Sequence, residues 1–162
     1  MRKVREVEVP QDSLLAHFGG PLDYRDAFCR EVTGAVSLEQ FIERFYCSMA
    51  FRPERVVLGL LGRGASDADA RALARGEADG IAVWQVVERC ETEVLLESPD
   101  TGTASWLAVE AVPTSSSAAV GKKSTAGTRL LFGSWVGSLN DSGWRFMLHP
   151  HVLYSRMLLS WS

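Results

Sequence analysis

Two histidines, His149 and His151, flank Pro150 near the end of the chain. Imidazoles so close in sequence could ligate a metal ion with help from elsewhere. On a regular helix, however, side chains two positions apart point away from each other, and the third histidine, His17, is far away in sequence. A turn at a helix entry, with one imidazole bonded to a backbone carbonyl, explains the pair better. We therefore predict no metal ion and no cofactor.

Motifs that commit a protein to one catalytic chemistry are missing. The glycine-rich stretch 59–64 ends a predicted helix and lacks the Lys-Ser/Thr ending of a phosphate loop, and there is no Gly-x-Ser-x-Gly nucleophile motif. General acid-base catalysis requires a titratable side chain with a shifted pKa inside a cavity. The candidates for that role are Glu88, Glu110, Tyr24, Tyr154 and His149. Each is more typical of a structural or surface position, so no catalytic residue is predicted.

One face of two predicted strands, 103–112 and 128–137, carries tryptophans beside charged residues: Trp106, Glu110, Arg129 and Trp135. If this face lines a cavity, it forms an aromatic pocket with a few polar anchors. If it faces outward, it forms an aromatic patch suited to a second copy or a protein partner. Burial of each tryptophan in the core, or under a loop, is the third interpretation. Trp84, on a preceding strand, is compatible with all three.

The segment 143–162 is mostly apolar and raises the question of a membrane anchor. A membrane span needs about 20 nearly uninterrupted apolar residues, and charged residues and histidines interrupt this segment, so we predict no span. The spacing instead predicts an amphipathic helix from Pro150 onward. Its apolar face, with the turn before it, would contribute Phe146, Leu153 and Met157 to a ligand site that also includes Trp84.

The composition is that of a soluble domain. The 162 residues are 46% hydrophobic and 23% charged, which is enough to form one core, and we expect a single domain over 1–162. A net charge of -3 argues against a nucleic-acid partner. The N-terminus has no apolar stretch of signal-peptide length, so we expect a cytoplasmic protein. Cys29, Cys47 and Cys90 are predicted to be reduced, buried thiols.

The order of elements predicts an α+β domain whose helices cover one face of an antiparallel sheet. A strand over 22–34 precedes a helix with a capping box at Ser37 and Gln40, a second helix from Pro53, and a third from Ser66 to about Gly76. Strands follow over 81–90, 92–98, 103–112 and 128–139. The first 20 residues are expected to be irregular, with a strand considered over 3–9, and 113–127 a mobile loop.

Four stretches carry a resemblance to a known superfamily: "DYRDAFCREVTGAVSLEQFIERFY", "SDADARALARGE", "TRLLFGS" and "HPHVLYSRMLL". They resemble a group of uncharacterised bacterial proteins of the helix-grip superfamily, also called START-like, polyketide-cyclase-like or SRPBCC. The resemblance implies a curved antiparallel sheet wrapped around a long C-terminal helix, with a cavity between them. The third small helix departs from the commonest order of this fold.

The function expected from these features is binding of a small apolar or amphipathic molecule in a cavity between the sheet and the C-terminal helix. The alternative is a structural or interaction protein that uses an aromatic sheet face to form a homodimer or to bind a partner. A cyclase- or hydrolase-like enzyme is the third hypothesis, because the superfamily includes carriers, receptors and enzymes, and fold alone does not choose among them.

Overall fold

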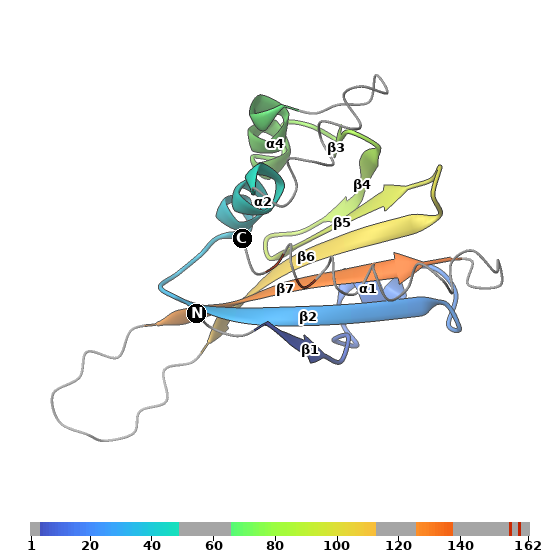
Figure 1. Cartoon of the computed structure of the whole chain (residues 1–162), viewed down its shortest axis with the longest axis horizontal. Helices are drawn as coiled ribbons and strands as arrows, with labels where there is room; N and C mark the ends of the chain where they lie inside the picture. The colour runs from blue at the N-terminus through green and yellow to red at the C-terminus, as the bar shows by residue number, and fades with distance from the viewer. Residues whose placement is uncertain (1–3, 49–65, 113–125, 138–155, 157–158, 160–162) are drawn as a thin grey trace, which may run out of the picture.

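The computed structural model of the chain describes residues 4–48, 66–112, 126–137, 156 and 159. Their strands form one seven-stranded antiparallel sheet in the order β1-β2-β7-β6-β5-β4-β3 (Figure 1). The strands are β1 (Arg5–Val7), β2 (Tyr24–Thr33), β3 (Gly80–Ile81), β4 (Trp84–Arg89), β5 (Glu93–Ser98), β6 (Thr103–Val112) and β7 (Gly127–Val136). The described helices are α1 (Leu14–His17), α2 (Leu38–Cys47) and α4 (Asp67–Ala74). The predicted α+β class is therefore confirmed.

Both helices predicted from their capping residues begin where expected. In α2 the Ser37 hydroxyl accepts a hydrogen bond from the Gln40 N–H at 3.2 Å, and the Gln40 side chain accepts from the Ser37 N–H at 3.1 Å. The same reciprocal box joins Ser66 and Asp69 at the start of α4. Gly76, with φ of +72°, follows the end of α4, where a left-handed residue commonly ends a helix. These local rules fixed the two helix positions.

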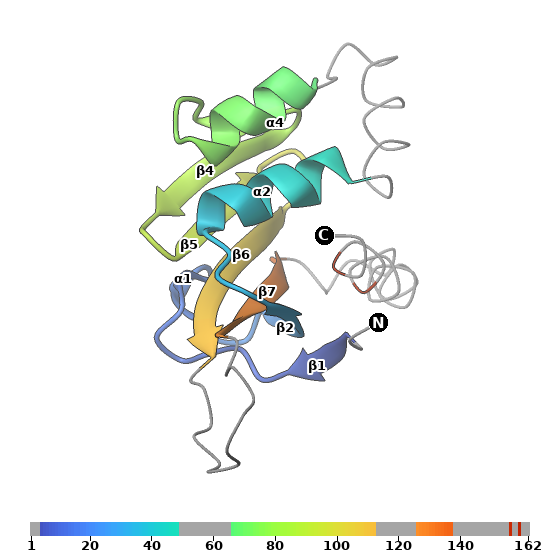
Figure 2. The same cartoon turned by 90° about the vertical axis from the view of Figure 1, so that its left-hand side faces the viewer.

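Helices α2 and α4 lie side by side over one face of the sheet, which we call the helix-side face (Figure 2). The ring of Phe45 on α2 stacks on Phe132 of β7, with centroids 5.0 Å apart. Apolar residues from β2, β5, β6 and β7 complete this core, including Phe28, Val94 and Leu107. The fully buried phenylalanine rings thus gather on the helix-side face.

The other face of the sheet, the opposite face, is covered by α1 and its flanking residues Val7, Val9 and Phe18, which we call the α1 layer. Its core consists mainly of small residues and two tryptophans: Leu15, Ala27, Cys29, Leu95, Ala104, Trp106, Ala108, Leu131 and Trp135. The small side chains leave room for two indole rings between the sheet and the α1 layer. The middle parts of β2, β6 and β7 are therefore buried on both faces of the sheet.

Polar side chains of the sheet hold the α1 layer in place. Glu93 on β5 accepts hydrogen bonds from the Leu14 N–H at 2.9 Å and from Trp106 Nε1 at 2.6 Å. Arg25 on β2 donates hydrogen bonds to four backbone carbonyls, those of Leu15, Phe18, Gly20 and Asp23. A guanidinium with its five N–H donors satisfies several such carbonyls at once. The anchoring groups thus lie directly beside the buried indoles.

Two predicted boundaries are wrong. In the first 20 residues, the strand considered over 3–9 is present as β1, but α1 was not predicted; a four-residue helix is too short to show helical periodicity. The segment 81–90, predicted as one strand, begins with the last residue of β3, turns at 82–83 and continues as β4. Ala82 has φ of +54° in that turn, where glycine or asparagine is usual, so the usual turn signal was missing.

Several predictions fall outside the described residues: the helix from Pro53, most of the loop 113–127, and the helix from Pro150. The helix-grip arrangement consequently stays a prediction. Two residues of the C-terminal segment are described, and both lie on the helix-side face. Leu159 belongs to its buried core, and the Arg156 guanidinium lies 5.6 Å from the centroid of the Phe28 ring.

Two further expectations concern a membrane-spanning helix and the cysteines. Among the described residues, no helix has the length and apolar character that crossing a membrane requires. The three cysteines are free, but only Cys29 is fully buried; Cys47 is partly exposed and Cys90 is exposed. The prediction of a buried thiol is therefore wrong for Cys90, which lies just after β4.

Candidate binding site

One end of the helix-side face is polar, although the rest of that face is apolar. Because side chains alternate between the two faces along each strand, these polar side chains lie on the same face as Phe28, Leu107 and Phe132. The backbone register aligns Asp26 with Ser134, and Ser134 with Ser105 on the next strand. We call the set of six the polar band: Tyr24, Asp26, Ser98, Thr103, Ser105 and Ser134.

Asp26 is the centre of the polar band. Its side chain is only 5% exposed, and both carboxyl oxygens are hydrogen-bonded. The Tyr24 hydroxyl donates to Oδ2 at 3.0 Å, and the Ser134 N–H donates to Oδ1 at 3.1 Å. Buried polar groups are stable when they are bonded in this way, so the carboxyl group has a fixed position and orientation.

Two hydroxyl groups of the polar band lack such partners. The side-chain oxygens of Ser98 and Ser134 are buried, and among the described residues neither has a hydrogen-bond partner. The two residues are 0% and 2% exposed. Burying a hydroxyl without a partner destabilises a protein by about 1–3 kcal/mol. These two oxygens are therefore buried polar groups of this face that have no partner among the described residues.

The Tyr24 hydroxyl has a raised pKa. Burial is the largest cause, and the neighbouring Asp26 carboxylate adds to it by charge and by accepting the phenol's hydrogen bond. The phenol is consequently neutral and a donor at physiological pH. A general acid or base works best with a pKa near the operating pH, so Tyr24, a candidate for that role from the sequence, is better suited to hold Asp26.

Alkaline unfolding provides a test of this environment. In the unfolded chain Tyr24 ionises near its ordinary pKa of 10.0, whereas the folded chain retains the proton to higher pH. Above pH 10 the unfolded state therefore binds fewer protons, and the free energy of unfolding falls as the pH rises. We expect wild type to be more stable than Tyr24→Phe near neutral pH and this difference to shrink above pH 10. Urea denaturation curves that shift in parallel for both proteins would contradict the assignment.

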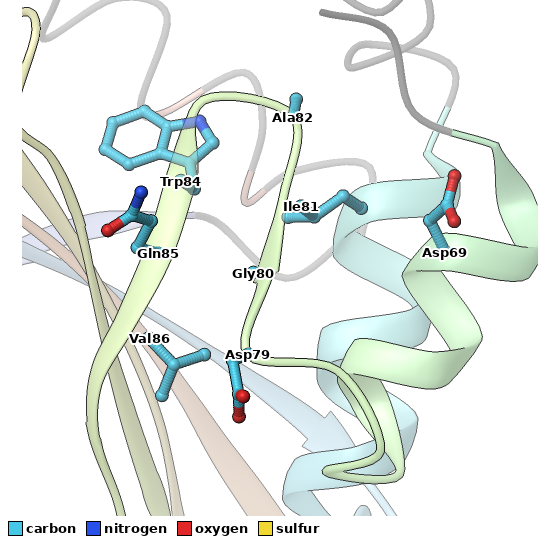
Figure 3. Close-up of a pocket in the computed structure, with 8 residues that line it drawn as sticks. All are labelled: Asp69, Asp79, Gly80, Ile81, Ala82, Trp84, Gln85 and Val86. Atoms are coloured by element: carbon cyan, nitrogen blue, oxygen red, sulfur yellow. The ribbon is translucent and has the colours of Figure 1, made fainter.

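A pocket of about 580 Å³ lies between α4 and the hairpin of β3 and β4 (Figure 3). Its lining residues are Asp69, Asp79, Gly80, Ile81, Ala82, Trp84, Gln85 and Val86. Figure 3 shows Asp69 on α4, across from the hairpin that carries the others. The two aspartates and Gln85 are exposed, so the pocket is open to solvent. Trp84 is the predicted ligand residue that lines it.

Trp106 and Trp135 lie on the opposite face, away from the polar band. They are 1% and 9% exposed beneath the α1 layer, and the Trp135 indole N–H donates to Asp23 at 3.0 Å. The structure therefore has both indoles in a core packed under an N-terminal segment, the third interpretation, and neither forms an exposed aromatic patch.

The two charged residues predicted with the tryptophans also lie on the opposite face. Arg129 forms an ion pair with Glu110 at 3.0 Å and a longer one with Glu31 at 3.6 Å. Phe146, Leu153 and Met157 lie outside the described residues. As a set, the predicted site residues are therefore not brought together by the described part of the chain.

Sequence reasoning missed Asp26, Ser98 and Ser134. A signal for the serine on β7 was present in the sequence, because Ser134 shares its alternating set with the apolar residues Leu130 and Phe132. Whether the Ser98 and Ser134 hydroxyls find a hydrogen-bond partner depends on the neighbouring strands, so the sequence of one strand alone does not reveal it.

Comparison of the chain with protein-family models, with curated proteins and with solved structures finds no match. Among the described residues, no group of three or more histidine, cysteine, aspartate or glutamate side chains is placed to hold a metal ion.

Proposed function

We propose that the protein binds a small amphipathic molecule on the helix-side face of its sheet, with the polar band as the polar anchor. The observation that supports this most is the pair of buried hydroxyls of Ser98 and Ser134, which have no hydrogen-bond partner among the described residues. They lie on the same face of the sheet as the buried apolar core that includes Phe28 and Phe132. Small-molecule sites typically combine such an apolar wall with a few placed polar groups.

The chemistry of the polar band suggests what the ligand presents to it. A serine hydroxyl both donates and accepts, so a ligand hydroxyl or carbonyl suits Ser134. Both oxygens of the neighbouring Asp26 carboxyl already accept hydrogen bonds, which hold the Tyr24 hydroxyl and the Ser134 backbone N–H in place. The apolar body of the ligand would lie along the helix-side core.

Binding without covalent chemistry agrees best with these groups. The raised pKa of Tyr24 makes the phenol a poor acid or base at neutral pH. Leu159 lies at the helix-side face, where its carbonyl accepts a hydrogen bond from Arg30 of β2 at 3.3 Å. The helix-grip resemblance implies a cavity between this face and a C-terminal helix.

Native mass spectrometry of the protein as purified from cells tests the proposal. We expect a bound adduct of about a few hundred daltons, the size of a typical pocket ligand. Replacing Ser134 with alanine should lower the bound fraction, with an affinity loss of about fivefold for one hydrogen bond.

Ser13→Ala is the matched control for that variant. Ser13 is also a buried serine, but it caps α1 on the other side of the sheet, so its loss destabilises the fold by about 1 kcal/mol without touching the ligand. The bound fraction should equal that of wild type. A bare wild-type protein, or an adduct that Ser98→Ala and Ser134→Ala leave unchanged, would refute the proposal.

A further inference from the structure

We propose that the pocket between α4 and the β3–β4 hairpin is a second binding site, which takes a small organic cation with an apolar body. This site lies apart from Asp26 and Ser134 of the polar band, because strands β6 and β5 lie between β7 and the hairpin. Ser98 of the band is on β5, the strand that pairs with β4. The volume of about 580 Å³ lies within the range of about 300–1,000 Å³ that small-molecule sites occupy.

The wall of this pocket is apolar on one side of the hairpin. Ile81 is the register partner of Trp84, and the Val86 N–H donates to the Asp79 carbonyl at 2.8 Å. Alternation then puts the apolar side chains of Ile81, Trp84 and Val86 on one face of the hairpin. The Asp79 side chain lies on the same face. The indole of Trp84, which is partly exposed, offers an aromatic face for stacking or for a cation.

The charge of the pocket selects the sign of its ligand. Two carboxylates, from Asp69 and Asp79, line it, and among the described lining residues there is no lysine, arginine or histidine. Asp69 is fixed by hydrogen bonds from the N–H and hydroxyl of Ser66 at 2.7 and 2.8 Å. Asp79 is exposed and is the counter-ion for a ligand ammonium group. An organic anion would be repelled.

The backbone around the pocket departs from regular geometry at two points. Ala82 is the one non-glycine residue of the described chain with a positive φ, at +54°, and the β4–β5 register shifts between Val86 and Glu88. Left-handed residues and β-bulges occur often beside binding sites, because they redirect side chains. Here Ala82 precedes Trp84 in the sequence, and the β-bulge at Val86 and Glu88 follows it.

A titration with three probes that share one aromatic ring tests this site. Phenethylammonium carries a positive charge, 2-phenylethanol is neutral and phenylacetate is negative. We expect saturable NMR shifts at the Trp84 indole and the Gln85 side-chain amide with phenethylammonium. Binding of the alcohol should be about fivefold weaker, since an exposed charge pair contributes up to about 1 kcal/mol, and phenylacetate should not bind.

Variants separate the charge from the aromatic ring. Asp79→Asn is a surface change that should weaken phenethylammonium binding by about 3- to 5-fold, and Trp84→Leu should weaken it similarly. Glu91→Gln removes the same charge at an exposed position beyond the pocket and should have no effect. Ser134→Ala should also have none, which distinguishes this site from the proposed ligand site. Equal binding of all three probes, or shifts that do not saturate, would overturn the proposal.

Discussion

Replacing Trp106 with alanine is expected to lower the free energy of unfolding by about 3–5 kcal/mol. The indole is 1% exposed and packs in the core between the sheet and the α1 layer. Its loss removes a large apolar contact and leaves a cavity, and it also removes the Nε1 hydrogen bond to Glu93. Chemical denaturation at neutral pH measures the change.

Two variants give this prediction its control. Trp84→Ala removes a partly exposed indole and should be less than half as destabilising, because less apolar surface returns to water. Trp106→Phe keeps most of the buried ring and should recover at least half of the stability lost in Trp106→Ala. If Trp106→Ala were no more destabilising than Trp84→Ala, the α1 layer would not be a second core.

Gly133→Ala is expected to destabilise the protein by about 2–3 kcal/mol through steric overlap. A Cβ atom at Gly133 would lie 2.5 Å from Cδ2 of Leu15, 2.7 Å from the Asp26 carbonyl oxygen and 2.9 Å from Cε3 of Trp106. The carbonyl belongs to the neighbouring strand and cannot move without disturbing the sheet. A missing side chain here is therefore what allows α1 and the indole to approach β7.

Gly127→Ala is the matched control, because the same strand carries both glycines. A Cβ atom at Gly127 would lie 3.2 Å from the Val32 carbonyl oxygen and in ordinary contact with Val112, so we expect a change below about 1 kcal/mol. A Gly133→Ala protein as stable as Gly127→Ala would contradict the close packing of the α1 layer on β7.

The sequence predicted those elements whose signals are local. The capping box at Ser37 and the N-cap serine at Ser66 located two helices, because each signal depends on residues only a few positions apart. Strands β2, β5, β6 and β7 were found from β-branched and aromatic runs between turn residues. The α1 layer was missed because its contacts, such as Leu14 with Glu93, join residues 79 positions apart.

The face occupied by the tryptophans could not be decided from alternation. On β6 both alternating sets are buried: Leu107 and Val109 pack on the helix side, and Trp106 and Ala108 pack under the α1 layer. Alternation identifies a core face only when the other face is exposed to water. With both faces covered, either register agrees with the pattern.

The candidate site was predictable only in part. Tyr24 was recognised as a residue able to exchange protons, and Trp84 as a ligand residue, because their types alone suggest such roles. Asp26 and Ser134 come together through the pairing of β2 with β7, across 108 positions of sequence. Their importance depends on burial and on which hydrogen bonds are made, and both properties arise only when the sheet is assembled.

The most direct test of ligand binding is a crystal structure of the protein as purified from cells, with attention to the side-chain oxygen of Ser134. We predict electron density of a non-protein molecule within hydrogen-bonding distance of that oxygen, about 2.5–3.2 Å, with its apolar part against the helix-side core. A Ser134 hydroxyl bonded to a protein atom, with side chains filling the space around it, would contradict the proposed function.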